Sequence, residues 1–119
     1  MNVAQPLVQT GLLGEAIDHG PAVVLVADEE MRYLAVNQRA CDVLGYTREE
    51  LLALTVPDVA PGPKTAQEFA DFVAAPPASG TIVLRRKDGT AVEFAYHAAR
   101  TTVAGMLLFV SIGFVADGR

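Results

Sequence analysis

One stretch decides the fold: Asn37-Gln38-Arg39-Ala40-Cys41-Asp42-Val43-Leu44-Gly45-Tyr46-Thr47-Arg48-Glu49-Glu50-Leu51-Leu52. The side chain of Asn37 can accept a hydrogen bond from the free N–H groups of a first helical turn, so we expect a helix to begin there. Gly45 is placed to end that helix in a left-handed conformation. Thr47 and Glu50 match a capping box, which predicts a second helix. We expect Pro57 to end this second helix, because proline cannot continue one.

The residues before this stretch predict one helix and two strands. Apolar residues recur at helical spacing between Leu7 and Ile17, which indicates an amphipathic helix whose apolar stripe needs a partner. Residues 21–28 form a continuous apolar run without alternation, the pattern of a strand that is covered on both faces. A turn leads from there to a second short strand over residues 32–36.

The residues after the central stretch predict one more helix and then strands alone. A second capping box at Thr65 opens a helix over residues 65–75. Three strands are expected to follow, at residues 81–87, 90–100 and 103–113. Asp88-Gly89 is a strong hairpin signal between the first two, and we expect Thr101-Thr102 to turn the chain into the last. The order predicts an α+β domain with a five-stranded antiparallel sheet and helices on one face.

The composition indicates one folded, soluble domain. Of the 119 residues, 51% are hydrophobic, which is enough for one core. The net charge of −5 and the lack of a basic block argue against nucleic acid as a partner, because that binding depends on Lys and Arg. No apolar run is long enough to predict a membrane span. The single cysteine, Cys41, excludes an internal disulfide and a cysteine-rich zinc site, and the absence of a basic leader also favours the cytoplasm.

Two motifs resemble the PAS family of sensory domains. In the stretch 37–52, an Asn-started helix runs into Gly-Tyr and then Thr-Arg-Glu-Glu-Leu. Leu84-Arg85-Arg86-Lys87-Asp88-Gly89-Thr90 is similar to the PAS hairpin with its Lys-Asp-Gly turn. The resemblance implies the sheet order 2-1-5-4-3, and the two strands without alternation fit its centre. We expect an N-terminal helix or cap over residues 1–19 and a PAS-like domain over residues 20–115, of the kind found in bacterial regulatory proteins.

The resemblance also implies a ligand pocket between the inner sheet face and the helices. Candidate lining residues come from both layers: Leu44, Val56, Phe69, Phe72, Val73, Phe94, Tyr96 and Phe109. The ligand would be a small apolar or amphipathic molecule, and no motif identifies it. The same aromatic residues would also suit a core that is filled by its own side chains.

The cofactor motifs of the family do not match this chain. Flavin-binding LOV domains carry an Asn-Cys-Arg-Phe-Leu-Gln helix whose Cys attacks the flavin; this chain lacks it, and Cys41 fits a buried core thiol. Haem-binding PAS domains usually take a His ligand from the helix before the hairpin, and residues 65–75 contain none. His97 is expected on the sheet face opposite Phe94 and Tyr96. A register shift of one residue would turn His97 into the pocket and bring haem back into consideration.

Catalysis and metal binding find little support in the sequence. The capping box accounts for Glu50, and no Ser/His/Asp or Cys/His arrangement is evident. The basic residues 85–87 fit the charged edge of a hairpin. A small α+β enzyme is a distant alternative, which would gain support only if a pocket gathered several of Glu93, Tyr96 and His97 within hydrogen-bond reach.

The outer sheet face is predicted to be a contact surface. The internal helices can cover only the inner face, yet the two central strands are apolar on both. The N-terminal helix, with Leu7, Leu12, Leu13 and Ile17, is expected to cover the outer face by folding back or by swapping onto a second copy, as PAS domains commonly do. We therefore expect a homodimer that controls an output domain, such as a kinase, cyclase or transcription regulator, linked to it or bound in trans. The alternative is a purely structural dimerisation module without ligand.

Overall fold

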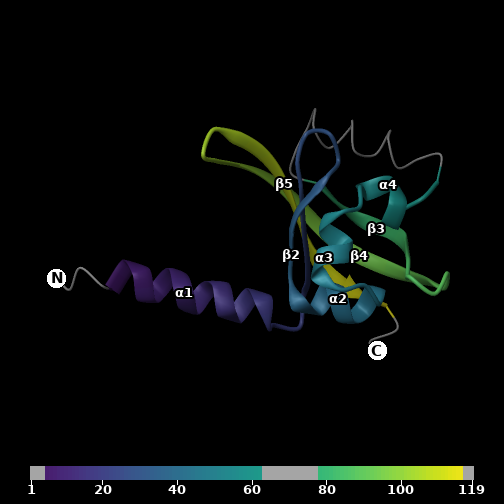
Figure 1. Cartoon of the computed structure of the whole chain (residues 1–119), viewed down its shortest axis with the longest axis horizontal. Coiled ribbons are helices and arrows are strands. Elements are labelled where there is room, and N and C mark those ends of the chain that lie inside the picture. The colour runs from purple at the N-terminus through teal and green to yellow at the C-terminus, as the bar shows by residue number, and fades with distance from the viewer. Residues whose placement is uncertain (1–4, 63–77, 117–119) are drawn as a thin grey trace.

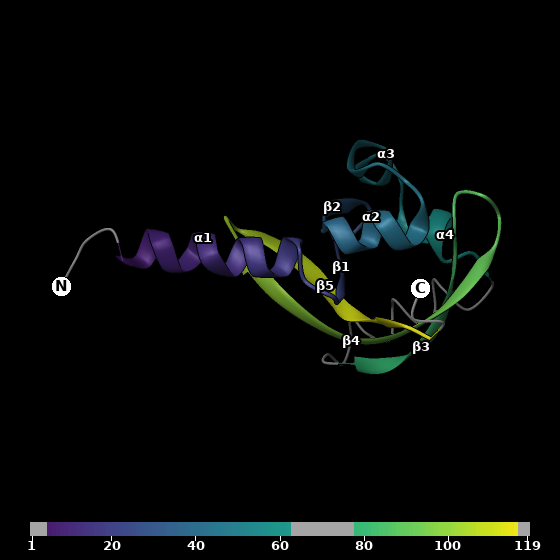
Figure 2. The same cartoon turned by 90° about the horizontal axis from the view of Figure 1, so that it is seen from below.

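The fold is a five-stranded antiparallel sheet with short helices on one face. The computed structural model describes residues 5–62 and 78–116. Its elements are α1 (Gln5–Asp18), β1 (Val23–Ala27), β2 (Tyr33–Val36), α2 (Gln38–Leu44), α3 (Arg48–Leu52), α4 (Val56–Val59), β3 (Ala78–Arg85), β4 (Ala91–Val103) and β5 (Met106–Val115). The strand order is β2-β1-β5-β4-β3, which confirms the predicted order with β1 and β5 at the centre. Figures 1 and 2 show α2, α3 and α4 gathered on one side of this sheet.

The central stretch folds as its capping residues predict. The Asn37 side chain accepts a hydrogen bond from the backbone N–H of Ala40 at 3.1 Å, and Gly45 ends α2 with a φ of 80°. Thr47 N–H donates to Glu50 Oε1 at 2.8 Å, while Glu50 N–H donates to Thr47 Oγ1 at 3.1 Å. Helices α2 and α3 therefore begin where side chains satisfy backbone groups that a helix leaves free.

The prediction that Pro57 ends the second helix is wrong. Helix α3 ends at Leu52, and Pro57 lies in the first turn of α4. Proline is accepted there because the N–H it lacks would have no partner inside the helix. Thr55 and Asp58 form a further capping box, with Thr55 N–H donating to Asp58 Oδ2 at 2.9 Å.

The predicted turn at Thr101-Thr102 is also wrong. Both threonines continue β4 and pair with Leu108 and Leu107 of β5. The chain turns at Ala104-Gly105 instead, where the φ angles are 51° and 77°. A tight hairpin turn needs two adjacent residues with positive φ, and β-branched threonine disfavours that conformation but suits a strand. Strand β3 begins at Ala78, before the expected residue 81, and the helix expected over residues 65–75 lies outside the described residues.

The two family-like motifs lie against each other. Lys87 N–H donates to the carbonyl of Leu44 at 2.9 Å, and Arg86 Nε donates to the carbonyl of Val43 at 3.1 Å. Lys87 Nζ also pairs with Glu50 Oε2 at 2.6 Å. The β3–β4 hairpin thus satisfies carbonyls at the C-terminal end of α2, which explains why both motifs belong to one fold.

Helix α1 stands apart from the rest of the domain. In Figures 1 and 2 it projects away from the domain, from the segment that leads into β1, instead of lying across a sheet face. None of the helices in the described ranges has the length and apolar character needed to cross a bilayer.

Candidate functional site

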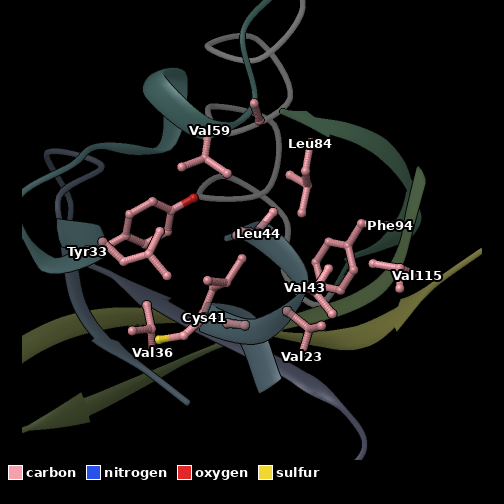
Figure 3. Close-up of a cluster of buried hydrophobic side chains, with 14 of the residues drawn as sticks. Val23, Tyr33, Val36, Cys41, Val43, Leu44, Val59, Leu84, Phe94 and Val115 are labelled. Atoms are coloured by element: carbon pink, nitrogen blue, oxygen red, sulfur yellow. The ribbon is translucent and has the colours of Figure 1, made fainter. Parts of the chain in front are cut away.

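Buried side chains of the sheet and of α2 and α4 pack together on the inner sheet face. Leu44 of α2 is 0% exposed and Phe94 of β4 is 2% exposed, and Figure 3 shows both within the same cluster. Phe94 and Tyr96 stack with ring centroids 5.9 Å apart. Tyr96 and Val56 are partly buried and pack against this core. The structure therefore brings four of the predicted pocket residues, Leu44, Val56, Phe94 and Tyr96, to one core.

The other predicted pocket residues are placed differently. Phe109 is buried in a separate small cluster with Ala98, to which Leu107 and Tyr96 also pack. Tyr96 thus contacts both clusters. Phe69, Phe72 and Val73 lie outside the described residues.

Several core residues were not among the predicted pocket residues. Val23, Val59, Leu84 and Val115 line the same cluster, as Figure 3 shows. The apolar run of β1 carried a signal for Val23, but the short helix α4 gave none for Val59. Tyr33 is also buried, and its desolvation raises the pKa of the phenol far above its ordinary value.

Cys41 lies on the core side of α2 and is buried. Burial raises the pKa of the Cys41 thiol, with the charge of nearby Arg48 acting in the opposite direction. A raised pKa disfavours the reactive thiolate. The location agrees with the interpretation of Cys41 as a core thiol.

His97 points to the outer sheet face, as its alternation with Phe94 and Tyr96 predicts. Its partners across the strands are Ser79 of β3 and Ile112 of β5. Ser79 Oγ and His97 Nδ1 are 2.9 Å apart, at an exposed position. Because Tyr96 lies on the inner face, it does not share a pocket with His97. Within residues 5–62 and 78–116, no three His, Cys, Asp or Glu side chains come together as a metal site would require.

A surface hollow lies between the end of α2 and the β3–β4 hairpin. It measures about 420 Å³ and is lined by residues 42–45 and 86–88. Its charged groups already have partners: Lys87 pairs with Glu50, Asp88 accepts from Thr90, and Asp42 accepts from Gln38. The hollow is thus the junction of the two motifs, built from groups that satisfy one another.

The outer sheet face exposes large apolar side chains. Phe114 of β5 is 58% exposed and Val83 of β3 is 53% exposed, while Ile112 of β5 is 39% exposed. Their strand neighbours Val115 and Leu84 belong to the core, so alternation places Phe114 and Val83 on the opposite face. We call Val83, Ile112 and Phe114 the outer apolar patch.

Helix α1 exposes the residues that were predicted to form a contact surface. Leu12 is 66% exposed, Leu13 is 59% exposed and Ile17 is 48% exposed. The side chain of Leu7 is outside the described set. The single chain thus leaves two apolar surfaces uncovered, one on α1 and one on the sheet.

Comparison with known proteins identifies the family. The family model described as the PAS fold matches residues 17–82. A comparison with curated protein sequences gives no match. Solved structures are similar over nearly the whole chain. The PAS domain of an HTR-like protein from Haloarcula marismortui is 22% identical with a TM-score of 0.79, covering 93% of this chain and 95% of that one.

Two further structures come from sensor histidine kinases. A domain of the sensory box sensor histidine kinase/response regulator from Geobacter sulfurreducens is 22% identical with a TM-score of 0.77, covering 92% of this chain and 96% of that one. A PAS domain from a two-component sensor histidine kinase is 13% identical with a TM-score of 0.81, covering 93% of this chain and 99% of that one. At these identities the structures establish a shared fold.

Proposed function

This chain belongs to the PAS family, and from that membership we propose that it is a non-catalytic signal-sensing module that works as a homodimer. Two copies associate through α1 and the outer sheet face, and the state of the inner core controls an output domain such as a kinase, cyclase or transcription regulator. The similarity to domains of sensor histidine kinases supports this role. We also propose that the protein is cytoplasmic and that it contacts neither nucleic acid nor a membrane.

The observation that carries dimerisation is the pair of uncovered apolar surfaces. Helix α1 has only 14 residues and includes Gly11 and Gly14. A helix of this length is marginal in water without packing, and each glycine costs about 1 kcal/mol relative to alanine. Burying a leucine contributes about 1.5–3 kcal/mol, so covering Leu12 and Leu13 would offset that cost. Helix α1 therefore needs a partner surface to be stable.

A second copy is the occupant that both surfaces favour. Helix α1 projects away from its own sheet and does not lie across the outer sheet face of the same chain (Figures 1 and 2). In a symmetric pair, each α1 could cover the outer apolar patch of the other copy. Both apolar surfaces would then be buried in both copies.

Light scattering coupled to size exclusion tests the dimer. We expect the parent chain to be dimeric and Leu13→Asp to be monomeric, because a carboxylate would be buried at the contact. Leu52→Asp is the matched control: Leu52 is also an exposed leucine, 41% exposed, but lies on α3 away from both surfaces. A monomeric parent, or a dimer that Leu13→Asp leaves intact, would contradict the proposal.

For the inner core, we propose a small apolar or amphipathic ligand without haem or flavin. The apolar character of the inner face supports such a ligand. The second candidate, a filled core in a purely structural dimerisation module, is favoured by the full burial of Leu44, Phe94 and Val59. Mass spectrometry of denatured protein separates the two, because only a sensor would release a reproducible small molecule. A visible absorption band from haem or flavin would refute the cofactor part.

A further inference from the structure

Asn37 connects α1 to the core through a buried side chain. It is 4% exposed, and its amide makes four hydrogen bonds. Nδ2 donates to the carbonyls of Ile17 at 2.7 Å and Ala22 at 2.8 Å. Oδ1 accepts from the N–H groups of Val24 at 3.0 Å and Ala40 at 3.1 Å. One side chain thus joins the last turn of α1, the start of β1 and the first turn of α2.

Asp18 and Arg48 make a second connection at the same place. Asp18 Oδ1 accepts from the backbone N–H of Gln38 at 3.0 Å and from Arg48 Nη2 at 2.8 Å. Arg48 Nη1 donates to the carbonyl of Val36 at 2.9 Å. The hydrogen bond from Arg48 also lowers the pKa of Asp18, which keeps this carboxylate charged. We call Asp18, Asn37 and Arg48 the α1 clamp.

The clamp holds the end of α1 that is nearest to the core. Asn37 and Arg48 bond the last turn of α1 and Asp18 belongs to it, whereas Leu12 and Leu13, nearer the N-terminus of α1, are mostly exposed. The direction in which α1 leaves the domain is therefore determined at its C-terminal turn.

The clamp is also joined to helix α2, which contributes side chains to the core. Helix α2 begins at the clamp, and its Ala40 and Leu44 are each 0% exposed within the main cluster. A displacement of α2 by an altered core would act on the same residues that orient α1. The clamp thus lies between the inner core and the proposed dimer contact.

We infer that the α1 clamp couples the position of α2 to dimerisation, by fixing the direction in which α1 reaches the second copy. This inference rests on the dimer proposed above. Asp18, the last residue of α1, and Arg48, the first residue of α3, then contribute to association, although neither belongs to the apolar surface of α1. By linkage, a ligand that changes the dimer affinity by some factor through the position of α2 has its own affinity changed by the same factor on dimerisation.

Sedimentation equilibrium of clamp variants tests the coupling. Arg48→Met and Asp18→Ala each remove the Arg48–Asp18 contact, and we expect each to raise the dimer Kd by about tenfold, the loss of one charge-assisted hydrogen bond. Lys87→Met is the matched control, because it removes an ion pair of similar exposure and length on the far side of α2. Its Kd should stay within about twofold of the parent, because this pair joins the β3–β4 hairpin to α3 and not to α1.

Hydrogen exchange gives a second readout. In the clamp variants, backbone amides of α1 should exchange faster, while those of β1 and β5 keep the protection of the parent. Dimers of Arg48→Met and Asp18→Ala with the affinity and α1 protection of the parent would overturn the coupling alone. A parent chain that is monomeric throughout would overturn both the dimer and the coupling.

Discussion

Replacing Asn37 by aspartate should make the stability of the domain depend strongly on pH. The acid keeps the one oxygen that accepts from both Val24 and Ala40. It places its second carboxylate oxygen against the carbonyls of Ile17 and Ala22, at the 2.7 and 2.8 Å separations of the present donor bonds. Burial and the two facing carbonyl dipoles both disfavour the charged form, so the pKa of the new side chain is raised in the folded state.

The magnitude follows from the lost bonds and the raised pKa. Each buried group left without a partner costs about 1–3 kcal/mol, so two lost donor bonds cost about 2–6 kcal/mol. A pKa raised by about two units adds about 3 kcal/mol at high pH. Because the folded pKa lies above the unfolded one, the added penalty is absent below the unfolded pKa, grows as the pH rises from the unfolded to the folded value, and is complete above it. Total stabilities are about 5–15 kcal/mol, so the variant is severely weakened at about pH 8.

Urea unfolding followed by circular dichroism measures this effect. The free energy of unfolding of Asn37→Asp, relative to the parent at the same pH, should be lower at about pH 8 than at about pH 5 by roughly 1 kcal/mol, because about half of the pH-dependent penalty is already present at pH 5. Gln9→Glu, which makes the same amide-to-acid change at an exposed position of α1, should show no such dependence. The reasoning is refuted if Asn37→Asp loses under about 1 kcal/mol at pH 8, or if its loss is the same at both pH values.

Three further predictions concern strand β5, the β4–β5 turn and the ion pair between Lys87 and Glu50. Gly113→Ala should lower the free energy of unfolding by about 3 kcal/mol or more, because a Cβ at Gly113 would collide with the carbonyl of Ala95; a melting temperature equal to that of the parent would disprove this. Ala104→Gly should raise the free energy of unfolding by about 0.5 kcal/mol, since glycine relieves the positive φ of 51° at that turn, and a lower value in urea titrations would contradict it. The hydrogen bond from Lys87 lowers the pKa of Glu50, so this pair stabilises the fold above about pH 4.5 and the contribution is lost as the pH falls further. Lys87→Met should therefore lose less stability than the parent on acidification, and an acid unfolding curve identical to that of the parent would argue against this pair.

The structure gives one physical reason for the two family motifs to occur together. The end of α2 leaves carbonyl groups without helical partners, and the β3–β4 hairpin supplies Arg86 and Lys87 as donors. The capping-box acid Glu50 then pairs with the same Lys87. Each motif has a local explanation in turn or cap chemistry, and their contact makes them one unit.

The sequence by itself determined the elements whose causes are local. Asn37, Gly45 and the Thr47–Glu50 box set helix boundaries through contacts within four residues, and the unalternating runs of β1 and β5 placed those strands in the centre of the sheet. The predicted Thr101-Thr102 turn failed because a hairpin turn depends on which two residues accept positive φ, and Ala104 does so here against its own preference.

Only the tertiary structure decided what depends on distant contacts. The cap residue Asn37 proved to be the attachment point of α1, because Ile17 and Ala22 are brought to it across 20 and 15 residues of chain. Core positions such as Val59 were equally hidden, since a short helix has no apolar period to read. Helix α1 itself shows an apolar pattern in the sequence, but only its direction away from the sheet leaves Leu12 and Leu13 uncovered.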